Sequence, residues 1–224
     1  MPENKENKGP VIVLLGPPGS GKSTQADFFV KQLGAVHIDI GGALRNVAHE
    51  DTAFGREVDE IIHVRRELVP DDIVRAVLER EFRTIPPEKL VIVDGAPRSE
   101  EQVDDVFSVV RDAGRKFLGA VFIVLPVEES VDRISKRYSC GECGRKFILG
   151  TNISDALTPC PDCGGTVVQR QDDTVEGVRK RWQVFHDNTL PVLRRFERKG
   201  VLTRVSGRQT SEEIFTQIRK DFGI

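Results

Sequence analysis

Short apolar runs alternate with longer amphipathic stretches along this chain. The runs are rich in Val, Ile and Leu, which is typical of strands buried on both faces of a parallel sheet. The stretches between them repeat apolar residues at helical spacing. The pattern therefore predicts an α/β fold in which helices flank a parallel five-stranded sheet. The predicted strands are Val11–Leu15, Val36–Ile38, Leu90–Val93, Val121–Leu125 and Val201–Val205.

The predicted helices include several with clear boundary signals. Thr210 and Glu213 have the spacing of a capping box, so a helix is expected to begin directly after Thr210. The predicted helices are Lys22–Leu33, Gly41–His49, Thr52–Arg66, Asp71–Phe82, Glu100–Asp112, Glu128–Arg137, Thr174–Arg198 and Ser211–Asp221.

Two segments interrupt the alternation. One has helices without an intervening strand, and the other holds all four cysteines, many turn-forming residues and few large apolar side chains. Both are interpreted as insertions into one α/β core. The predicted division is a core of residues 1–39, 72–137 and 170–224, a helical insertion of residues 40–71, and a cysteine-containing insertion of residues 138–169.

Composition excludes several classes of protein. The 33 basic residues nearly balance the 35 acidic residues, which argues against a general nucleic-acid binder. No apolar run approaches the roughly 18 residues that a membrane span needs. The polar N-terminus has no apolar segment of the kind found in secretory signals. These observations predict a cytoplasmic protein without membrane association.

Residues 16–24 read GPPGSGKST and match the phosphate-binding loop pattern G-x-x-x-x-G-K-[ST]. A predicted strand precedes the motif and a predicted helix follows it, as the motif requires. The glycines let backbone N–H groups converge on phosphate oxygens at a helix N-terminus. Lys22 is predicted to reach the β- and γ-phosphates, and the Ser23 hydroxyl to ligate Mg²⁺. A glycine-rich turn with a chance lysine is the weaker alternative.

Asp94 follows the predicted strand Leu90–Val93 directly. An acidic residue at the carboxyl edge of the sheet is well placed to hold a water molecule bound to Mg²⁺. Capping of a turn or helix is the alternative role.

The four cysteines form two C-x-x-C pairs separated by 16 residues. This is the spacing of a zinc ribbon, in which four thiolates complete a closed tetrahedral shell. Such a shell has no open position for water, so the predicted zinc ion is structural. Disulfides and a redox-active C-x-x-C are the alternatives. The predicted ligands are Cys140, Cys143, Cys160 and Cys163.

Several arginines flank the insertions or follow strands. Arg133 and Arg137 are four residues apart on the predicted helix Glu128–Arg137, so both are expected to project from one face of it. Arg98 follows the strand that ends at Asp94. Arg45 belongs to the first insertion. Guanidinium groups in such positions suit the binding of phosphate oxygens, although each taken alone also fits a solvated surface residue.

The chain resembles the adenylate kinases, specifically the form with a long, zinc-binding lid. The resemblance is specific because it follows the whole chain in order. Its motifs are GPPGSGKST at 16–24, IGGALR at 40–45, ELVPDDIV at 67–74, VDGAPRSEEQ at 93–102, DRISKR at 132–137, the four cysteines, and QRQDDTVEGVRKRW at 169–182. It implies the P-loop nucleoside-monophosphate kinase fold, with an AMP-binding insertion and a zinc-ribbon-like lid.

The resemblance implies the reversible, Mg²⁺-dependent reaction ATP + AMP = 2 ADP, in a monomer whose lid and AMP-binding insertion close over the substrates. Arg133 is implied to stack on the ATP adenine as well. The residues implied to bind ATP are Gly19, Ser20, Gly21, Lys22, Ser23, Thr24, Arg133 and Arg137. Those implied to be catalytic are Lys22, Arg98, Arg137, Arg170, Asp172, Asp173 and Arg181, the two aspartates by stabilising the closed lid and positioning arginines.

The resemblance also implies an AMP site in which Arg45 and Arg98 hold the phosphate and Gln102 contacts the base. The implied AMP-binding residues are Ile40, Arg45, Val69, Gly95, Arg98, Gln102, Arg170 and Arg181.

Departures from the family pattern fall on this AMP side. Ile40 stands where the family usually has Thr, Gly42 where it has Asp, and Ala96 where an aromatic residue is common; Asp39 and Glu67 are also atypical. The acceptor therefore has alternatives, CMP or UMP. A third hypothesis is a nucleic-acid-binding zinc ribbon switched by nucleoside triphosphate, but residues 139–168 carry few cations and one Phe.

Overall fold

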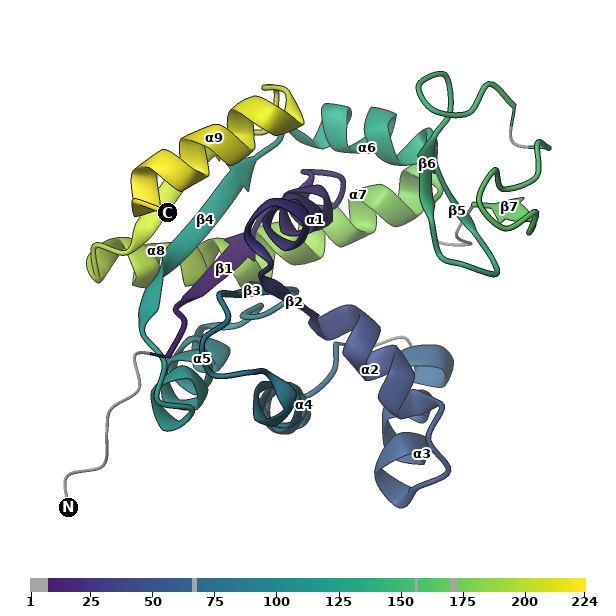
Figure 1. Ribbon diagram of the computed structural model, residues 1–224. Helices are drawn as coiled ribbons and strands as arrows, with labels where there is room; N and C mark the ends of the chain where they lie inside the picture. Colours follow the sequence, from purple (N-terminus) through teal and green to yellow (C-terminus); the bar gives the residue numbers. More distant parts are fainter. Residues whose placement is uncertain (1–7, 66–67, 156, 170–172) are drawn as a thin grey trace, which may run out of the picture. The chain divides into compact units, whose positions relative to one another are not determined.

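The computed structural model describes residues 8–65, 68–155, 157–169 and 173–224. These residues belong to two compact units (Figure 1). Unit 1 comprises Met1–Gly16, Gly21–Val124 and Asp187–Ile224, and unit 2 comprises Pro17–Ser20 and Leu125–His186. The predicted division into a core and two insertions at 40–71 and 138–169 stays a prediction.

Unit 1 is built on a parallel five-stranded sheet, as predicted, with the strand order β2-β3-β1-β4-β8. Apart from Asp94 at the end of β3, the central strands carry apolar side chains on both faces, so helices must cover both faces. The strands are β1 (Val11–Leu15), β2 (Val36–Asp39), β3 (Val91–Asp94), β4 (Phe117–Val124) and β8 (Leu202–Ser206).

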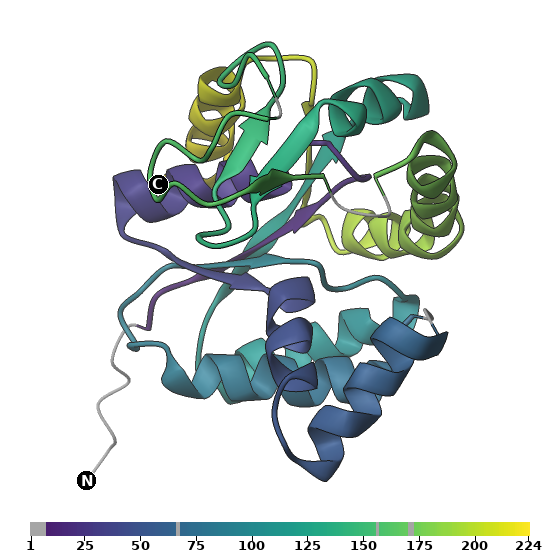
Figure 2. The ribbon, with the colours of Figure 1, turned by 90° about the vertical axis from the view of Figure 1, so that its right-hand side faces the viewer.

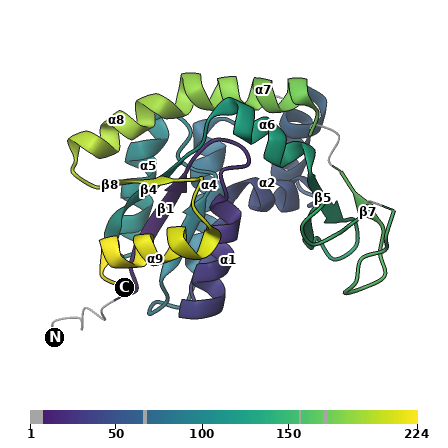
Figure 3. The ribbon, with the colours of Figure 1, turned by 90° about the horizontal axis from the view of Figure 1, so that it is seen from above.

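Helices cover both faces of this sheet. Figure 3 shows α1 and α9 on one side of β1, β4 and β8, and α5 and α8 on the other. Figure 2 shows α4 lying beside α5, with α2 and α3 leading away from the end of β2. The helices of unit 1 are α1 (Lys22–Leu33), α2 (Ile40–Ala48), α3 (Ala53–Asp59), α4 (Asp71–Thr84), α5 (Glu100–Asp112), α8 (Leu190–Arg198) and α9 (Ser211–Phe222).

Aromatic residues fill the core on both faces. Phe29 of α1 contacts Phe215 of α9 edge-on, with ring centroids 5.0 Å apart. On the opposite face, Phe196 of α8 stacks on Phe117 of β4 at 5.8 Å. The capping box predicted at the start of α9 is confirmed, because Thr210 accepts from the Glu213 N–H and Glu213 accepts from the Thr210 N–H.

Strand β4 begins at Phe117, four residues before the predicted start at Val121. Gly119 explains the early start. Because it has no side chain, the residue before β8 and the end of α9 can pack directly against the β4 backbone. A Cβ at position 119 would lie 2.9 Å from the Val201 carbonyl oxygen and 2.6 Å from the Phe222 ring. The sequence Phe-Leu-Gly-Ala lacks the β-branched residues from which a strand is predicted.

Two predicted long helices are interrupted. The helix expected over Thr52–Arg66 is α3 followed by a π-helical turn, Glu60–Arg65, and Arg66 lies outside the described residues. The helix expected over Thr174–Arg198 is α7 (Val175–Val184), a π-helical turn (Phe185–Thr189) and α8. Pro191 in the first turn of α8 has no N–H to donate to the preceding turn, which accounts for the second interruption.

Unit 2 combines two helices with a small antiparallel sheet of order β6-β5-β7. The sequence pattern did not predict this sheet, because its strands are only two to four residues long. Its core consists of Phe147, Ile153 and Val167 together with Cys140 and Cys160. The elements are α6 (Val127–Ser135), β5 (Arg137–Cys140), β6 (Lys146–Ile148), β7 (Val167–Val168) and α7.

Among the described residues, no helix is both long enough and apolar enough to cross a membrane.

Arg115 ties together the loops at the amino end of the unit 1 sheet. Its guanidinium donates to four backbone carbonyl oxygens, those of Gly9 (3.0 Å), Lys89 (2.7 Å), Pro86 (2.8 Å) and Ile85 (3.3 Å). The residue is 7% exposed, and burial lowers its pKa, although a guanidinium stays charged at neutral pH. One buried side chain therefore joins the segments that lead into β1 and β3.

We predict that Arg115→Met destabilises unit 1 by about 3 kcal/mol, because buried carbonyl groups lose their donor while the side-chain volume is kept. Urea unfolding followed by circular dichroism measures this change. Arg111→Met is the matched control, since Arg111 is exposed and pairs only with neighbouring surface groups. Equal unfolding free energies for the two variants would contradict the role assigned to Arg115.

Candidate active site and metal centre

The loop after β1 has the local geometry of an anion-binding turn. Gly19 and Gly21 have φ angles of 73° and 100°, in the left-handed region that side chains disfavour. Gly21 is the N-cap of α1 and has no side chain that could cap the helix, which is the arrangement found where a helix N-terminus binds an anion. Lys22 Nζ donates to the Gly16 carbonyl oxygen at 2.9 Å, which holds the ammonium group back over the loop.

Ser130 holds one peptide of the same loop. Its hydroxyl donates to the Pro18 carbonyl oxygen at 2.5 Å, and the residue is completely buried in unit 2. Because the carbonyl and N–H of a trans peptide point in opposite directions, this bond turns the Gly19 N–H away from Ser130. No local sequence pattern identifies Ser130 as a partner of the loop, because it lies 112 residues from Pro18.

Ser23 and Asp94 meet at the carboxyl ends of β1 and β3. The Ser23 hydroxyl donates to Asp94 Oδ2 at 3.1 Å, and Asp94 is 5% exposed. His37 Nε2 lies 4.0 Å from the same carboxylate oxygen. Two oxygen groups at this distance suit a hard cation such as Mg²⁺, held directly by the hydroxyl and through water by the carboxylate. His37 lies on β2, the neighbour of β3 in the sheet, and this strand order brings it close to Asp94.

A pocket in unit 1 is lined mainly by α2, by residues 68–74 at the start of α4, and by residues 95–102 between β3 and α5; Ile62 and Asn188 complete the lining. Six of the predicted AMP-binding residues line it, although the sequence spreads them over more than sixty positions. They are Ile40, Arg45, Val69, Gly95, Arg98 and Gln102. Apolar and amide side chains beside two guanidinium groups suit a ligand that combines a flat ring with an anion.

The arginines of this pocket are held by their neighbours. Arg98 Nε donates to the Gly95 carbonyl oxygen at 2.9 Å. Arg45 lies 3.7 Å from Asp39 Oδ2. That same oxygen would lie 2.8 Å from a Cβ at position 42, so Gly42 leaves room for the Asp39 carboxylate. The atypical residues Asp39 and Gly42 are therefore spatially coupled.

Asp173 joins two arginines in unit 2. Its carboxylate accepts from Arg137 Nε at 3.0 Å and from a terminal nitrogen of Arg137 at 2.7 Å, and from Arg181 at 2.7 Å. The Asp173 side chain is 1% exposed, whereas the Arg137 and Arg181 side chains are 26% and 29% exposed. Two cations are thus held side by side with part of each surface open to solvent.

One expectation about these arginines is wrong. Helix α6 ends at Ser135, and Arg137 begins strand β5, so Arg133 and Arg137 do not share a helical face. Lys136 leaves the helical conformation with φ −97° and ψ 0°, which starts the antiparallel pairing of β5 with β6. Arg170 and Asp172, both predicted site residues, lie outside the described residues.

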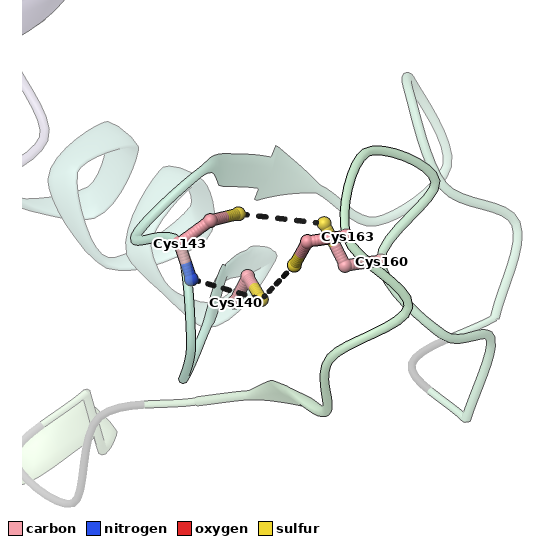
Figure 4. A group of neighbouring side chains, drawn as sticks. All are labelled: Cys140, Cys143, Cys160 and Cys163. Atoms are coloured by element: carbon pink, nitrogen blue, oxygen red, sulfur yellow. Dashed lines mark hydrogen bonds between the residues drawn. The ribbon is translucent and has the colours of Figure 1, made fainter.

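The four cysteine sulfurs converge at the end of unit 2, as Figure 4 shows. All four lie within 4.8 Å of one another, with Cys140 and Cys163 3.5 Å apart and Cys143 and Cys160 3.6 Å apart. A zinc ion bound to four thiolates at about 2.3 Å separates its sulfurs by roughly 3.8 Å, so the cluster has the dimensions of a tetrahedral metal site. A Cβ at position 165 would lie 2.9 Å from Cys140 Sγ, so Gly165 is required for this approach.

The environment of the four thiols alters their pKa values in a way that favours binding of a cation. Backbone N–H groups of Cys143 and Glu142 donate to Cys140 Sγ and lower the pKa of that thiol. The Gly165 N–H favours the Cys163 thiolate, yet the neighbouring Cys143 and Cys140 raise the pKa of Cys163 to about 12. Four thiolates in this space repel one another, and a bound dication removes that repulsion. The cluster therefore has the ligand set and the spacing that a metal site requires.

Comparison with known proteins gives a consistent result. The family model described as "Adenylate kinase" matches residues 14–201. The adenylate kinase of Syntrophomonas wolfei is 32% identical over 209 residues, which are 93% of this chain and 97% of that protein. The adenylate kinase of Pyrococcus furiosus is 34% identical over 93% of each chain. That of Kosmotoga olearia is 34% identical over 94% of this chain and 97% of its own.

We predict that Asp173→Asn lowers the stability of unit 2 by ~2 kcal/mol, less than the 3–5 kcal/mol for a fully buried pair because both arginines are partly exposed. Trp182, the single tryptophan, lies in α7 and reports unfolding of this unit by its fluorescence. Asp132→Asn serves as the control, since Asp132 forms only an exposed pair with Lys136. A variant at position 173 as stable as that control would show that the cluster contributes little.

Proposed function

The chain belongs to the adenylate kinase family, and we propose that it catalyses reversible phosphoryl transfer from Mg²⁺-ATP to AMP, giving two ADP. One observation carries the proposal. Unit 1 combines the start of α1, with Gly21, Lys22 and the Ser23–Asp94 pair, with a separate pocket lined by Arg45 and Arg98. A triphosphate site and a second anion site together support a kinase whose acceptor is itself a phosphorylated nucleoside.

On the donor side, we assign phosphate binding to the N–H groups of residues 19–24 and to Lys22. The left-handed glycines and the uncapped start of α1 support this assignment. The Ser23 hydroxyl and, through water, the Asp94 carboxylate would hold Mg²⁺, whose oxygen preference they satisfy. When bound, the ion supplies charge neutralisation on the transferring group.

On the acceptor side, Arg45 and Arg98 would hold the AMP phosphate. A phosphate oxygen is already anionic near neutral pH, so the transfer needs no general base. The chain's own contribution is then to position two anionic groups in line and to neutralise their charge. Ile40, Val69 and Gly95 would pack against the nucleoside, and Gln102 would contact the base.

Unit 2 would supply further cations for the transferring phosphoryl group. Asp173 holds Arg137 and Arg181 together while both arginine side chains stay partly exposed, which supports their assignment as phosphate ligands. Arg133 is assigned to the ATP base and phosphates by family resemblance. Arg170 and Asp172 are assigned on the same ground, and they lie outside the described residues.

The metal of the cysteine cluster is proposed to be Zn²⁺ in a structural role. Four thiolates at tetrahedral spacing select zinc and leave no position for a reacting water. Cys140 and Cys160 also belong to the small core of unit 2, so the metal and that core stabilise each other.

We predict one zinc ion per chain and four thiols that are protected from thiol reagents until a chelator removes the metal. Loss of zinc is expected to lower the unfolding temperature of unit 2, because its core is small. Elemental analysis combined with thiol titration measures both. Cys143→Ser is expected to reduce zinc content, and Ser139→Ala, beside the cluster but with no thiol, to leave it unchanged. Less than half a zinc per chain with all four thiols intact would exclude the assignment.

The acceptor is tested with AMP, CMP, UMP and GMP, each with Mg²⁺-ATP. We predict fastest turnover with AMP, and a loss of at least about a hundredfold in Lys22→Ala and Arg98→Ala, because Lys22 neutralises charge on the transferring phosphate and Arg98 on the acceptor phosphate. Lys31→Ala, at an exposed position of the same helix α1, is the control for Lys22. Preference for CMP or UMP would select the alternative acceptor, and no product with any of the four would refute the kinase.

A further inference from the structure

The Gln102 side chain is held at both of its amide atoms. Its Oε1 accepts from the Arg98 backbone N–H at 2.7 Å, and its Nε2 donates to Asp71 Oδ1 at 2.6 Å. The residue is 5% exposed and lines the proposed AMP pocket with both of these partners. The second oxygen of Asp71 accepts from the Ser99 hydroxyl at 2.9 Å.

The two partners allow only one orientation of the amide. A backbone N–H is always a donor, so the atom that faces Arg98 must be the oxygen. A carboxylate is an acceptor, so the atom that faces Asp71 must be the nitrogen. The flipped amide would oppose donor to donor and acceptor to acceptor, and both hydrogen bonds would be lost.

Helix capping accounts for only one of these bonds. Ser99 is the N-cap of α5 and accepts from the Gln102 N–H, and the Gln102 oxygen satisfies a second N–H at this helix end. Capping leaves the amide nitrogen without a role. Asp71 belongs to a different helix, α4, and lies 31 positions earlier in the chain. Of the two amide atoms of Gln102, it bonds only to the nitrogen.

The fixed amide has one N–H and one oxygen lone pair left, in a defined order. Adenine and cytosine present an amino donor beside a ring-nitrogen acceptor, whereas guanine and uracil present a carbonyl acceptor beside a ring N–H. Gln102 in this orientation matches the first pair of bases with both atoms. The second pair would place acceptor against acceptor and donor against donor in the same pose.

We propose that Asp71 is a positioning residue that fixes the Gln102 amide and thereby selects amino-bearing bases, AMP and CMP, over GMP and UMP. The proposal rests on the assignment of this pocket as the acceptor site. AMP and GMP form the most informative comparison, because both are purines and differ mainly in the edge that the amide meets.

The test measures kcat/KM for AMP and GMP with Mg²⁺-ATP in the wild type and in variants. Asp71→Ala is expected to reduce the AMP:GMP ratio by about tenfold, within the discrimination that a two-point base contact gives. Asp71→Asn is expected to keep most of the ratio, because its oxygen still accepts from Gln102 Nε2. Asp72→Ala, an exposed neighbour that bonds only to the Ile73 N–H, is expected to match the wild type.

Variants made in the Gln102→Ala background distinguish a positioning role of Asp71, which acts through Gln102, from a purely structural role. If Asp71 acts through Gln102, adding Asp71→Ala to Gln102→Ala changes the ratio less than twofold. An unchanged ratio in Asp71→Ala, or an equal drop with and without Gln102, overturns the proposal. Should Asp71→Ala not fold, Asp71→Ser has the same expected ratio, since its hydroxyl can still meet Ser99 but is too short for Gln102. A wild type inactive with every acceptor refutes the kinase assignment itself and is distinct from these outcomes.

Discussion

The parallel pairing of β2, β3 and β1 is the constraint on which the nucleotide sites of unit 1 depend. Because the three strands run in the same direction, their carboxyl ends lie at one edge, with Asp39 opposite Asp94 and Asp94 opposite Leu14. The phosphate-binding loop follows β1, α2 follows β2, and the turn containing Gly95 and Arg98 follows β3. Strand β3 lies between β2 and β1, so its end contributes to both proposed sites. Asp94 bonds to Ser23 on the donor side, and Gly95 and Arg98 line the proposed acceptor pocket.

Acidic and carbonyl partners close to each arginine explain how a chain of net charge −2 can gather several cations in the proposed site. Four arginines of the proposed site have acceptors within the protein: Arg45 has Asp39, Arg98 has a backbone carbonyl, and Arg137 and Arg181 share Asp173. These contacts fix the side chains and reduce the repulsion between like charges. Phosphate then meets guanidinium groups that are already oriented, so less conformational entropy is lost on binding.

The parts of the structure that the sequence predicted are those that local patterns determine. Helices α1 and α5 and strand β1 have the predicted bounds, and the loop at 16–24 and the cysteine pairs follow from spacing alone. The errors have nonlocal causes. Arg137 was assigned to a helix because its residue type fits one, but pairing of β5 with β6 decides its conformation. Asp71, Ser130 and Arg115 bond to partners far along the chain, so no window of sequence contains the signal.

The departures from the family pattern acquire a physical meaning in the pocket. Ile40 removes a hydroxyl and Gly42 removes a carboxylate, while Asp39 places its own carboxylate in the space beside Gly42. The uncharged or acidic polar side chains left among the lining residues are Asp71, Ser99, Gln102 and Asn188. Asp71 and Ser99 bond to each other, and Asp71 also holds Gln102. Under the proposed assignment, base recognition depends mainly on the Gln102 amide, and its selectivity depends on that amide having one orientation. Because Ile40 and Gly42 contribute no polar side chain, the choice of base in the proposed site depends more strongly on the orientation of the Gln102 amide.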